Sequence, residues 1–286
     1  MRLCRYDDDR VGVVRDDRVF DVTGIAARLG QHGYPLPRHD LLIAALPALR
    51  GEIEALAAAV EGIPCADVRF AAPVANPGKL MAAPVNYVDH LEEAKEVLIT
   101  YFEQKVEQIH KIGLFLKATS SLVGEDEPIR LRLDDRRNDH ELELACVIGK
   151  RADRVSADDA LECVAGYCVG LDITLRGPEE RSMRKSSDTY SVLGPWLVTA
   201  DELPDPSGLD MHLEVNGERR QTANTSDLIL SVPKLIEFAS RYYTLHPGDV
   251  IFTGTPAGVG EIVAGDTITA TIERIGTLTA HVGEVR

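Results

Sequence analysis

Cysteine is scarce in this chain of 286 residues, and the few cysteines form no pattern. There are five, at positions 4, 65, 146, 163 and 168, and no two of them form a CxxC pair. Structural zinc sites and the disulfide frameworks of small secreted proteins need paired, regularly spaced cysteines. The sequence therefore predicts reduced thiols in a cytoplasmic protein, without a zinc site or disulfide framework.

Long hydrophobic runs and a signal peptide are also lacking. No apolar run reaches the ~18–20 residues that a membrane span needs, and the start, MRLCRYDDDRVGVV, has no apolar core and no small-residue cleavage site. Basic residues are outnumbered, 31 against 46 acidic ones, which gives a net charge of −15. This acidity disfavours nucleic acid and anionic membranes as partners, although a local basic pocket can still bind a small anion.

The succession of apolar runs predicts a mostly β, α+β fold. Residues 1–72 combine short strands with an Ala/Leu-rich helix near 41–60, which is typical of a small N-terminal α/β domain. The turn-rich stretch 71–79 indicates a boundary to a second domain, 73–286. In this second part short apolar runs alternate with turns, and the βαβ alternation of doubly wound folds is missing.

Two glutamates, Glu141 and Glu143, interrupt an otherwise apolar strand, NDHELELACVIGK, residues 138–150. Alternation with period 2 places both on one face, together with Ala145 and Val147. Burying two neighbouring ionised carboxylates is costly, whereas a hard divalent cation removes the problem because carboxylate oxygens are its natural ligands. A solvated edge strand, with the glutamates paired to nearby arginines, is the alternative that this strand alone leaves open.

A third carboxylate, Asp172, lies within another apolar run, GYCVGLDITLRG, residues 166–177. Aspartate is unfavourable in a buried strand unless it is paired or bound to a cation. Three carboxylates on core strands, with no His or Cys cluster nearby in the sequence, predict an oxygen-ligand site for Mg²⁺ or Mn²⁺, with Ca²⁺ also possible. A buried ion pair between Asp172 and Arg176 is the alternative.

His90 and Glu93 are spaced i, i+3 in PVNYVDHLEEA, where an amphipathic helix begins. Residues three apart on a helix are neighbours, so Glu93 could orient the imidazole of His90 as a general base for water. Lys185, in KSSDTYSVLGPWLVT, is a candidate for contact with a substrate carboxylate. For all three residues an ordinary surface position is the alternative.

A predicted strand runs into a glycine-rich turn in LHPGDVIFTGTPAGVG, residues 245–260. Gly254, Gly258 and Gly260 allow backbone amides to approach a ligand closely, and Thr255 adds a hydroxyl. The turn favours a cradle for a substrate carboxylate or a developing oxyanion, although such turns are often purely structural. It is not a nucleotide-binding loop, since GxxxxGK[ST] and a helix-opening GxGxxG are both absent.

The order of these motifs resembles the fumarylacetoacetate hydrolase (FAH) family. NYxxHxxE is followed by FLK, a strand with ExE, GYxxxxD, KSxDxxxxxGPW and PGDVIxTGTPAGVG, from about Asn86 to the C-terminus. The last motif is highly specific to that family. The resemblance implies a mixed β-roll catalytic domain, a homodimer, and small keto or diketo acid substrates chelated through adjacent oxygens.

The resemblance also implies roles for individual residues. Glu141, Glu143 and Asp172 match the family's metal ligands. His90 and Glu93 match its water-activating dyad, which lies on a segment that becomes ordered as a lid over the substrate. Lys185 matches a lysine that contacts the substrate's oxygens. The predicted substrate-binding residues are Thr255, Gly254, Arg176 and Lys117.

The leading hypothesis is a divalent-metal-dependent hydrolase that cleaves a C–C bond in a small 2,4-diketo acid, either an acylpyruvate or a sugar-derived 2,4-diketo-3-deoxy acid. Water activated by His90 would attack the 4-keto carbon, and an enolate would leave as a pyruvate-like acid. The alternatives are a decarboxylase of an acid such as oxaloacetate and an isomerase of a hydroxydienoic acid. A third alternative is a non-catalytic metal- or ligand-binding β domain. The candidate base argues against it, because a pure binding domain needs no base.

Two features depart from the common FAH pattern. After Asp172 many members have D-x-x-x-R-D-x-Q, but DITLRGPE places Gly177 and Glu179 at the positions of the second acid and the amide. A glutamate there would repel a second substrate carboxylate. The connection from Glu93 to Phe115 also includes a long amphipathic helix, 91–112, which suits either an enlarged lid or an interface element.

Overall fold

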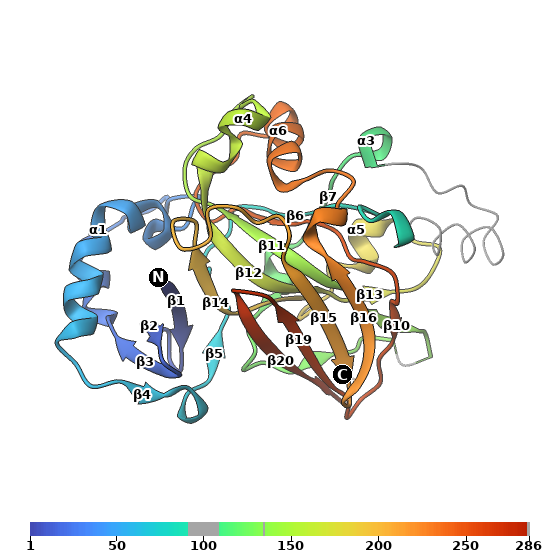
Figure 1. Ribbon diagram of the computed structural model, residues 1–286, viewed down its shortest axis with the longest axis horizontal. Helices are drawn as coiled ribbons and strands as arrows, with labels where there is room; N and C mark the ends of the chain where they lie inside the picture. The colour runs from blue at the N-terminus through green and yellow to red at the C-terminus, as the bar shows by residue number, and fades with distance from the viewer. Residues whose placement is uncertain (91–108, 134, 285–286) are drawn as a thin grey trace.

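The computed structural model describes residues 1–90, 109–133 and 135–284, whose arrangement is shown in Figure 1. The chain begins with antiparallel hairpins formed by β1 (Arg2–Tyr6), β2 (Arg10–Arg15) and β3 (Arg18–Asp21). Asp16 and Asp17 join β2 to β3 with φ of 47° and 57°, the conformation that a tight two-residue hairpin turn requires. The predicted helix near 41–60 is confirmed as α1 (Leu41–Ala58), and Asp40 caps it by accepting the N–H of Ile43.

One large mixed sheet runs through the molecule and carries most of the core. Its order is β4-β3-β2-β1-β14-β12-β11-β17-β6-β7, while β5 pairs with β1 and β8 with β14. The strands not yet given are β4 (Ile63–Pro64), β5 (Phe70–Ala71), β6 (Leu80–Ala82), β7 (Phe115–Lys117), β8 (Leu122–Val123), β11 (Leu142–Ile148), β12 (Val164–Asp172), β14 (Ser191–Thr199) and β17 (Val250–Phe252). Because β1 pairs with β14, the block 1–72 shares this sheet with the rest of the chain. The domain boundary at residue 72 stays a prediction.

Two smaller sheets complete the β structure. One has the order β13-β10-β18, from β10 (Asn138–His140), β13 (Thr174–Leu175) and β18 (Gly260–Glu261). The other has the order β16-β15-β19-β20-β9, from β9 (Ile129–Arg130), β15 (Asp210–Val215), β16 (Glu218–Asn224), β19 (Thr267–Ile272) and β20 (Gly276–Gly283). The β15–β16 turn is Asn216-Gly217, with φ of 52° and 80°, a residue pair that favours this turn.

The remaining helices are short and lie around the sheets. They are α3 (Ile109–Ile112), α4 (Ala157–Ala160), α5 (Arg181–Arg184) and α6 (Val232–Tyr242), with 3-10 helices η1 (Thr23–Leu29), η2 (Cys65–Asp67), η3 (Thr119–Ser121), η4 (Leu161–Cys163) and η5 (Thr225–Asp227). Of the helix predicted at 91–112, only α3 falls within the described residues. Within the described ranges, no helix combines the length and apolar character needed to cross a membrane.

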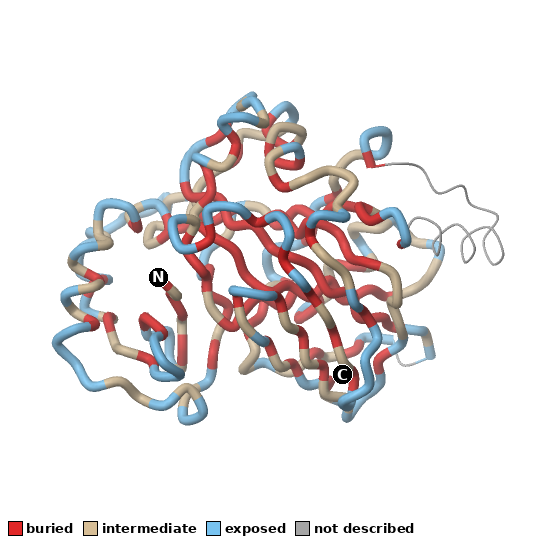
Figure 2. The backbone as a smooth tube through the Cα atoms, in the orientation of Figure 1, coloured by how far each residue is buried: buried red, intermediate tan, exposed pale blue. Residues whose placement is uncertain are grey.

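The strand β11 is buried on both faces, as Figure 2 shows for the centre of the sheet. Leu144 and Cys146 pack in one apolar cluster, while Ala145 and Val147 pack in another on the opposite face. The alternative of a solvated edge strand is therefore wrong. All five cysteines are free thiols. The predicted strand-dominated fold class is confirmed.

Candidate active site

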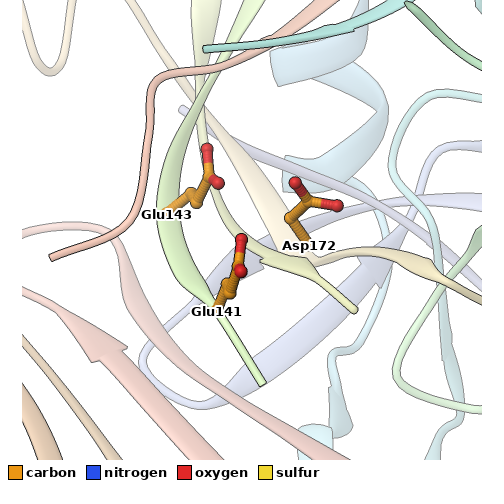
Figure 3. Close-up of side chains that lie close together, drawn as sticks. All are labelled: Glu141, Glu143 and Asp172. Atoms are coloured by element: carbon orange, nitrogen blue, oxygen red, sulfur yellow. The ribbon is translucent and has the colours of Figure 1, made fainter. Parts of the chain in front are cut away.

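Three carboxylates meet at the paired ends of β11 and β12. Glu143 lies within β11, Asp172 ends β12, and Glu141 immediately precedes β11. The register pairs Leu142 with Leu171, and the N–H of Asp172 donates to the carbonyl of Glu141 at 2.9 Å. Cross-strand neighbours project from the same face of a sheet. The three side chains accordingly point toward one another in Figure 3.

The three carboxylates are buried and close enough to share one cation. One oxygen from each lies within 4.8 Å of the other two. Only 4% of Glu141, 1% of Glu143 and 1% of Asp172 is exposed. Because Mg²⁺ and Mn²⁺ prefer such oxygen ligands, the donor set and its spacing fit the metal that the sequence predicts.

Two buried lysines bind the same carboxylates. Lys185 Nζ donates to Glu141 Oε2 and to Asp172 Oδ2, both at 2.6 Å. Lys117 Nζ donates to Asp172 Oδ1 and to the carbonyl of Tyr190, the latter at 2.8 Å. Both lysines were predicted from the sequence to lie near the metal or the substrate, and the structure brings them to the triad.

The guanidinium of Arg176, the residue that follows β13, reaches the triad. Its Nη2 donates to Glu141 Oε1 at 3.1 Å, and its Nε donates to Asp139 Oδ2 at 2.7 Å. The alternative sequence interpretation paired Arg176 with Asp172. In the structure the lysines bind Asp172 instead, and Arg176 binds Glu141.

These contacts divide the carboxylates into two kinds. Burial opposes ionisation of Glu141, but Lys185 and Arg176 outweigh it and lower the pKa of Glu141 to about 2. At Glu143, burial and the charge of Asp172 act in the same direction and raise the pKa well above its ordinary value. Burial lowers the pKa of Lys185, yet Asp172 and Glu141 more than offset this and raise it. Glu143 is thus the carboxylate whose ionisation an added cation would favour most.

The glycine-rich turn after β17 lies against Glu143. The N–H of Gly254 donates to Glu143 Oε2 at 2.6 Å. Gly254 has φ of 106°, and a Cβ there would lie 2.6 Å from the Cβ of Asn86, so only glycine fits. Thr255 follows directly and is buried. The two residues predicted to bind substrate through this turn therefore lie beside the triad.

Gln221, on β16, is a residue that sequence reasoning did not single out. Its Nε2 donates to Thr255 Oγ1 and to the carbonyl of Pro256, each at 2.9 Å. Its Oε1 accepts the N–H of Leu142 at 3.0 Å and lies 3.2 Å from His140 Nδ1. Gln221 thus holds the TGTP turn against the strand that carries the glutamates. In the sequence Gln221 begins the segment QTANTSDLI, residues 221–229, and none of the candidate site residues lies in that segment.

The candidate base, His90, is buried near the triad. It is 8% exposed, and its electrostatic interaction with Glu141 contributes to the lowered pKa of that carboxyl. Its predicted partner, Glu93, lies outside the described residues. The His90–Glu93 dyad therefore stays a prediction.

Gly177 and Glu179, the two positions that differ from the family's D-x-x-x-R-D-x-Q pattern, form one local arrangement with Arg136. The guanidinium of Arg136 donates to both carboxylate oxygens of Glu179, at 2.9 and 2.7 Å, and lowers the pKa of Glu179 to about 2. A Cβ at Gly177 would lie 1.5 Å from Arg136 Nη2, so glycine is what admits this guanidinium. The negative charge of Glu179 is thus paired, and the expected repulsion of a second substrate carboxylate stays a prediction.

Comparison with known proteins agrees with the motifs. The model of the fumarylacetoacetate (FAA) hydrolase C-terminal family matches residues 79–283. This chain belongs to the fumarylacetoacetate hydrolase family. The match includes the triad, both lysines and the glycine-rich turn, so the resemblance drawn from the order of the motifs is confirmed.

Full-length relatives place the chain more narrowly within the FAH family. It is 55% identical to maleylpyruvate hydrolase of Aquipseudomonas alcaligenes, over 100% of both chains. It is 37% identical to 2,4-didehydro-3-deoxy-L-rhamnonate hydrolase of Sphingomonas sp. (strain SKA58), over 100% of this chain and 97% of that one. The crystal structure of maleylpyruvate hydrolase from Sphingobium sp. SYK-6 in complex with manganese(II) ion and pyruvate superposes with a TM-score of 0.85, at 40% identity and 100% coverage of both chains.

Proposed function

We propose that this FAH-family protein is a divalent-metal-dependent hydrolase of acylpyruvate-type 2,4-diketo acids. The observation that carries the proposal is the buried triad bridged by Lys185, because a divalent cation held by three carboxylates, next to a lysine, suits an acid that binds through adjacent oxygens. The names of the two full-length relatives support the same class of substrate. Maleylpyruvate is accordingly the first substrate to test.

Glu141, Glu143 and Asp172 would hold Mn²⁺ or Mg²⁺ through their carboxylate oxygens. A cation bound there supplies a Lewis acid for the 2-oxo and carboxylate oxygens of the substrate. Binding of a cation is favourable at Glu143 in particular. Burial and the charge of Asp172 raise the pKa of Glu143, and a cation beside it would favour its ionised form. The opposing Lys185 keeps its charge and lies within hydrogen-bond distance of the same oxygens.

The chain's own residues can perform the proton transfers of the hydrolysis. His90 would take a proton from a water molecule as the water oxygen attacks the 4-keto carbon, with Glu93 orienting the imidazole. The C3–C4 bond then breaks, its electron pair passes to the enolate of pyruvate, and the proton held by His90 returns to C3. Lys185 would donate to the enolate oxygen, and the Thr255 hydroxyl, held by Gln221, would donate to the substrate carboxylate. Arg176 and Lys117 would support this site by fixing Glu141 and Asp172.

The test is release of pyruvate from maleylpyruvate by the Mn²⁺-loaded protein, measured by coupling to lactate dehydrogenase. We expect His90→Ala to lower kcat by about 10²–10⁴-fold, the usual contribution of a general base. Binding of Mn²⁺, measured by electron paramagnetic resonance, should stay unchanged. Full turnover by His90→Ala would refute the role of His90, and failure of the native protein on acylpyruvates would refute the proposed reaction.

We also propose a homodimer in the cytoplasm. The family pattern supports the dimer, and five free thiols, four of them buried, suit a reducing compartment. Light scattering coupled to size-exclusion chromatography would measure the mass in solution. A monomer at micromolar concentration would contradict the dimer.

A further inference from the structure

Beside the candidate active site, Arg181 has no ion-pair partner among the residues that the structure describes. It opens α5, one turn before Lys185. Its guanidinium carbon lies 5.6 Å from the centre of the Phe115 ring, and Lys185 Nζ lies 5.5 Å from the same centre. Among the described residues no carboxylate forms an ion pair with Arg181. Its N–H donors are therefore available to a ligand.

The carboxylates nearest to Arg181 are engaged elsewhere. Glu141 and Asp172 both bind Lys185, and Glu180 accepts a backbone N–H within its own short helix. Burial lowers the pKa of Arg181, and these three carboxylates offset the effect only in part. A half-buried guanidinium whose burial is only partly compensated by nearby carboxylates is stabilised further when an additional anion binds to it.

The neighbouring arginines, Arg176 and Arg184, already bind oxygen atoms of this chain. Arg176 binds two carboxylates. Arg184 donates to the carbonyls of Leu175 and Glu179, at 3.0 and 2.8 Å. Arg176 and Arg184 thus each use two guanidinium nitrogens on groups of this chain, whereas no hydrogen bond from Arg181 to a described residue competes with an incoming anion for its fork of donors.

The geometry points to Arg181 as the residue that binds the distal carboxylate of a dicarboxylic 2,4-diketo acid, an inference that rests on the proposed function. Arg181 and Lys185 each lie within 5.6 Å of the centre of the Phe115 ring, so they are at most about 11 Å apart, and a seven-carbon chain built from ~1.5 Å bonds spans about 7–8 Å between its terminal carbons. A guanidinium binds a carboxylate through two parallel N–H···O bonds. A substrate with a neutral tail would leave these donors unpaired, so the site selects diacids.

The test compares two ligands that differ only at the distal end, 2-oxoheptanedioate and 2-oxoheptanoate, neither of which has a 4-keto group to cleave. Isothermal titration of the Mn²⁺-loaded protein should show that the diacid binds about 10–100-fold more tightly, as a charge-assisted, two-point contact predicts. Arg181→Met keeps an unbranched apolar side chain and removes the guanidinium that lies over Phe115. It should bring the ratio of the two affinities close to one.

Two further variants control for misfolding. Arg181→Lys keeps the charge but not the fork, so it should retain part of the preference and also serves if Arg181→Met does not fold. Arg184→Met removes the next cation of the same helix; it should preserve the ratio even if both affinities fall.

Equal binding of the two ligands by the native protein, failure of both to bind, or an unchanged ratio in Arg181→Met would overturn the inference. Turnover plays no part in this measurement. Selective binding of the diacid through Arg181, without hydrolysis of any 2,4-diketo acid, would refute the proposed reaction and still support the role of Arg181.

Discussion

Replacing Lys185 with methionine should lower stability and raise metal affinity at the same time. The ammonium group lies 2.6 Å from both Glu141 and Asp172, and all three groups are buried. Removing one partner of a buried ion pair leaves uncompensated charge and costs about 3–5 kcal/mol. With a conversion of about 2–4 °C per kcal/mol, we expect the unfolding midpoint to fall by roughly 10 °C in chelator.

The gain in metal affinity follows from the same contacts. Lys185 and a bound cation both interact with the negative charges of Glu141 and Asp172. Without the lysine these charges are uncompensated, so they attract a divalent cation more strongly. Adding MnCl₂ should therefore raise the midpoint of Lys185→Met by more than that of the native protein. Turnover should nevertheless stay low, since Lys185 would also stabilise the enolate.

The assay is thermal unfolding followed by circular dichroism, in chelator and across a titration of MnCl₂. Lys79→Met is the matched control, because Lys79 pairs with the buried Asp249 at 2.7 Å, away from the triad. It should lose stability in chelator and show the native response to MnCl₂. The reasoning fails if Lys185→Met is as stable as the native protein in chelator, or if its response to MnCl₂ is no larger.

Three further predictions follow from contacts outside the Lys185 cluster. Gly177→Ala places a Cβ 1.5 Å from Arg136 Nη2. It should lower the free energy of unfolding by on the order of 1 kcal/mol in the native background and leave it unchanged in an Arg136→Ala background, and a double-mutant cycle measures this coupling. Burial raises the pKa of Glu125 from 4.5 to about 7, so its protonated form is favoured in the folded state and stability falls as pH rises from 4.5 to 7. Glu125→Gln should therefore add about 2–3 kcal/mol at pH 8 and nothing at pH 4 in urea unfolding; an equal effect at both pH values would count against this. Gln221→Leu removes the donor that holds Thr255, so KM should rise more than kcat falls, and an unchanged KM would contradict the positioning role.

Much of the candidate site was predictable because it depends on local patterns. Period-2 alternation places Glu141 and Glu143 on one face of a strand whatever that strand packs against. A carboxylate in an apolar run needs a partner, and the same reasoning selected Asp172. The structure brings these three together with Lys185 and Lys117, as the sequence led us to expect.

The errors and omissions concern partners that are distant in the sequence. Arg176 was paired with the wrong carboxylate in one interpretation, because four residues of separation suggested Asp172 while the fold presents Glu141. The partner of Glu179, Arg136, comes from another segment and was not foreseen when Glu179 was considered as an unpaired charge. Neither pairing can be found by periodicity, which describes one element at a time.

The sequence by itself determined the strand-rich class of the protein, the side chains available for chemistry and, through the order of the motifs, the family. Only the tertiary structure decided how the charges are distributed among them. The register of β11 against β12 sets Glu141 opposite Asp172, and the fold places Lys185 between them and Arg181 over the Phe115 ring. The physical reason is that the energy of a buried charge depends on its few nearest neighbours in space, and those neighbours come from elements that are far apart along the chain.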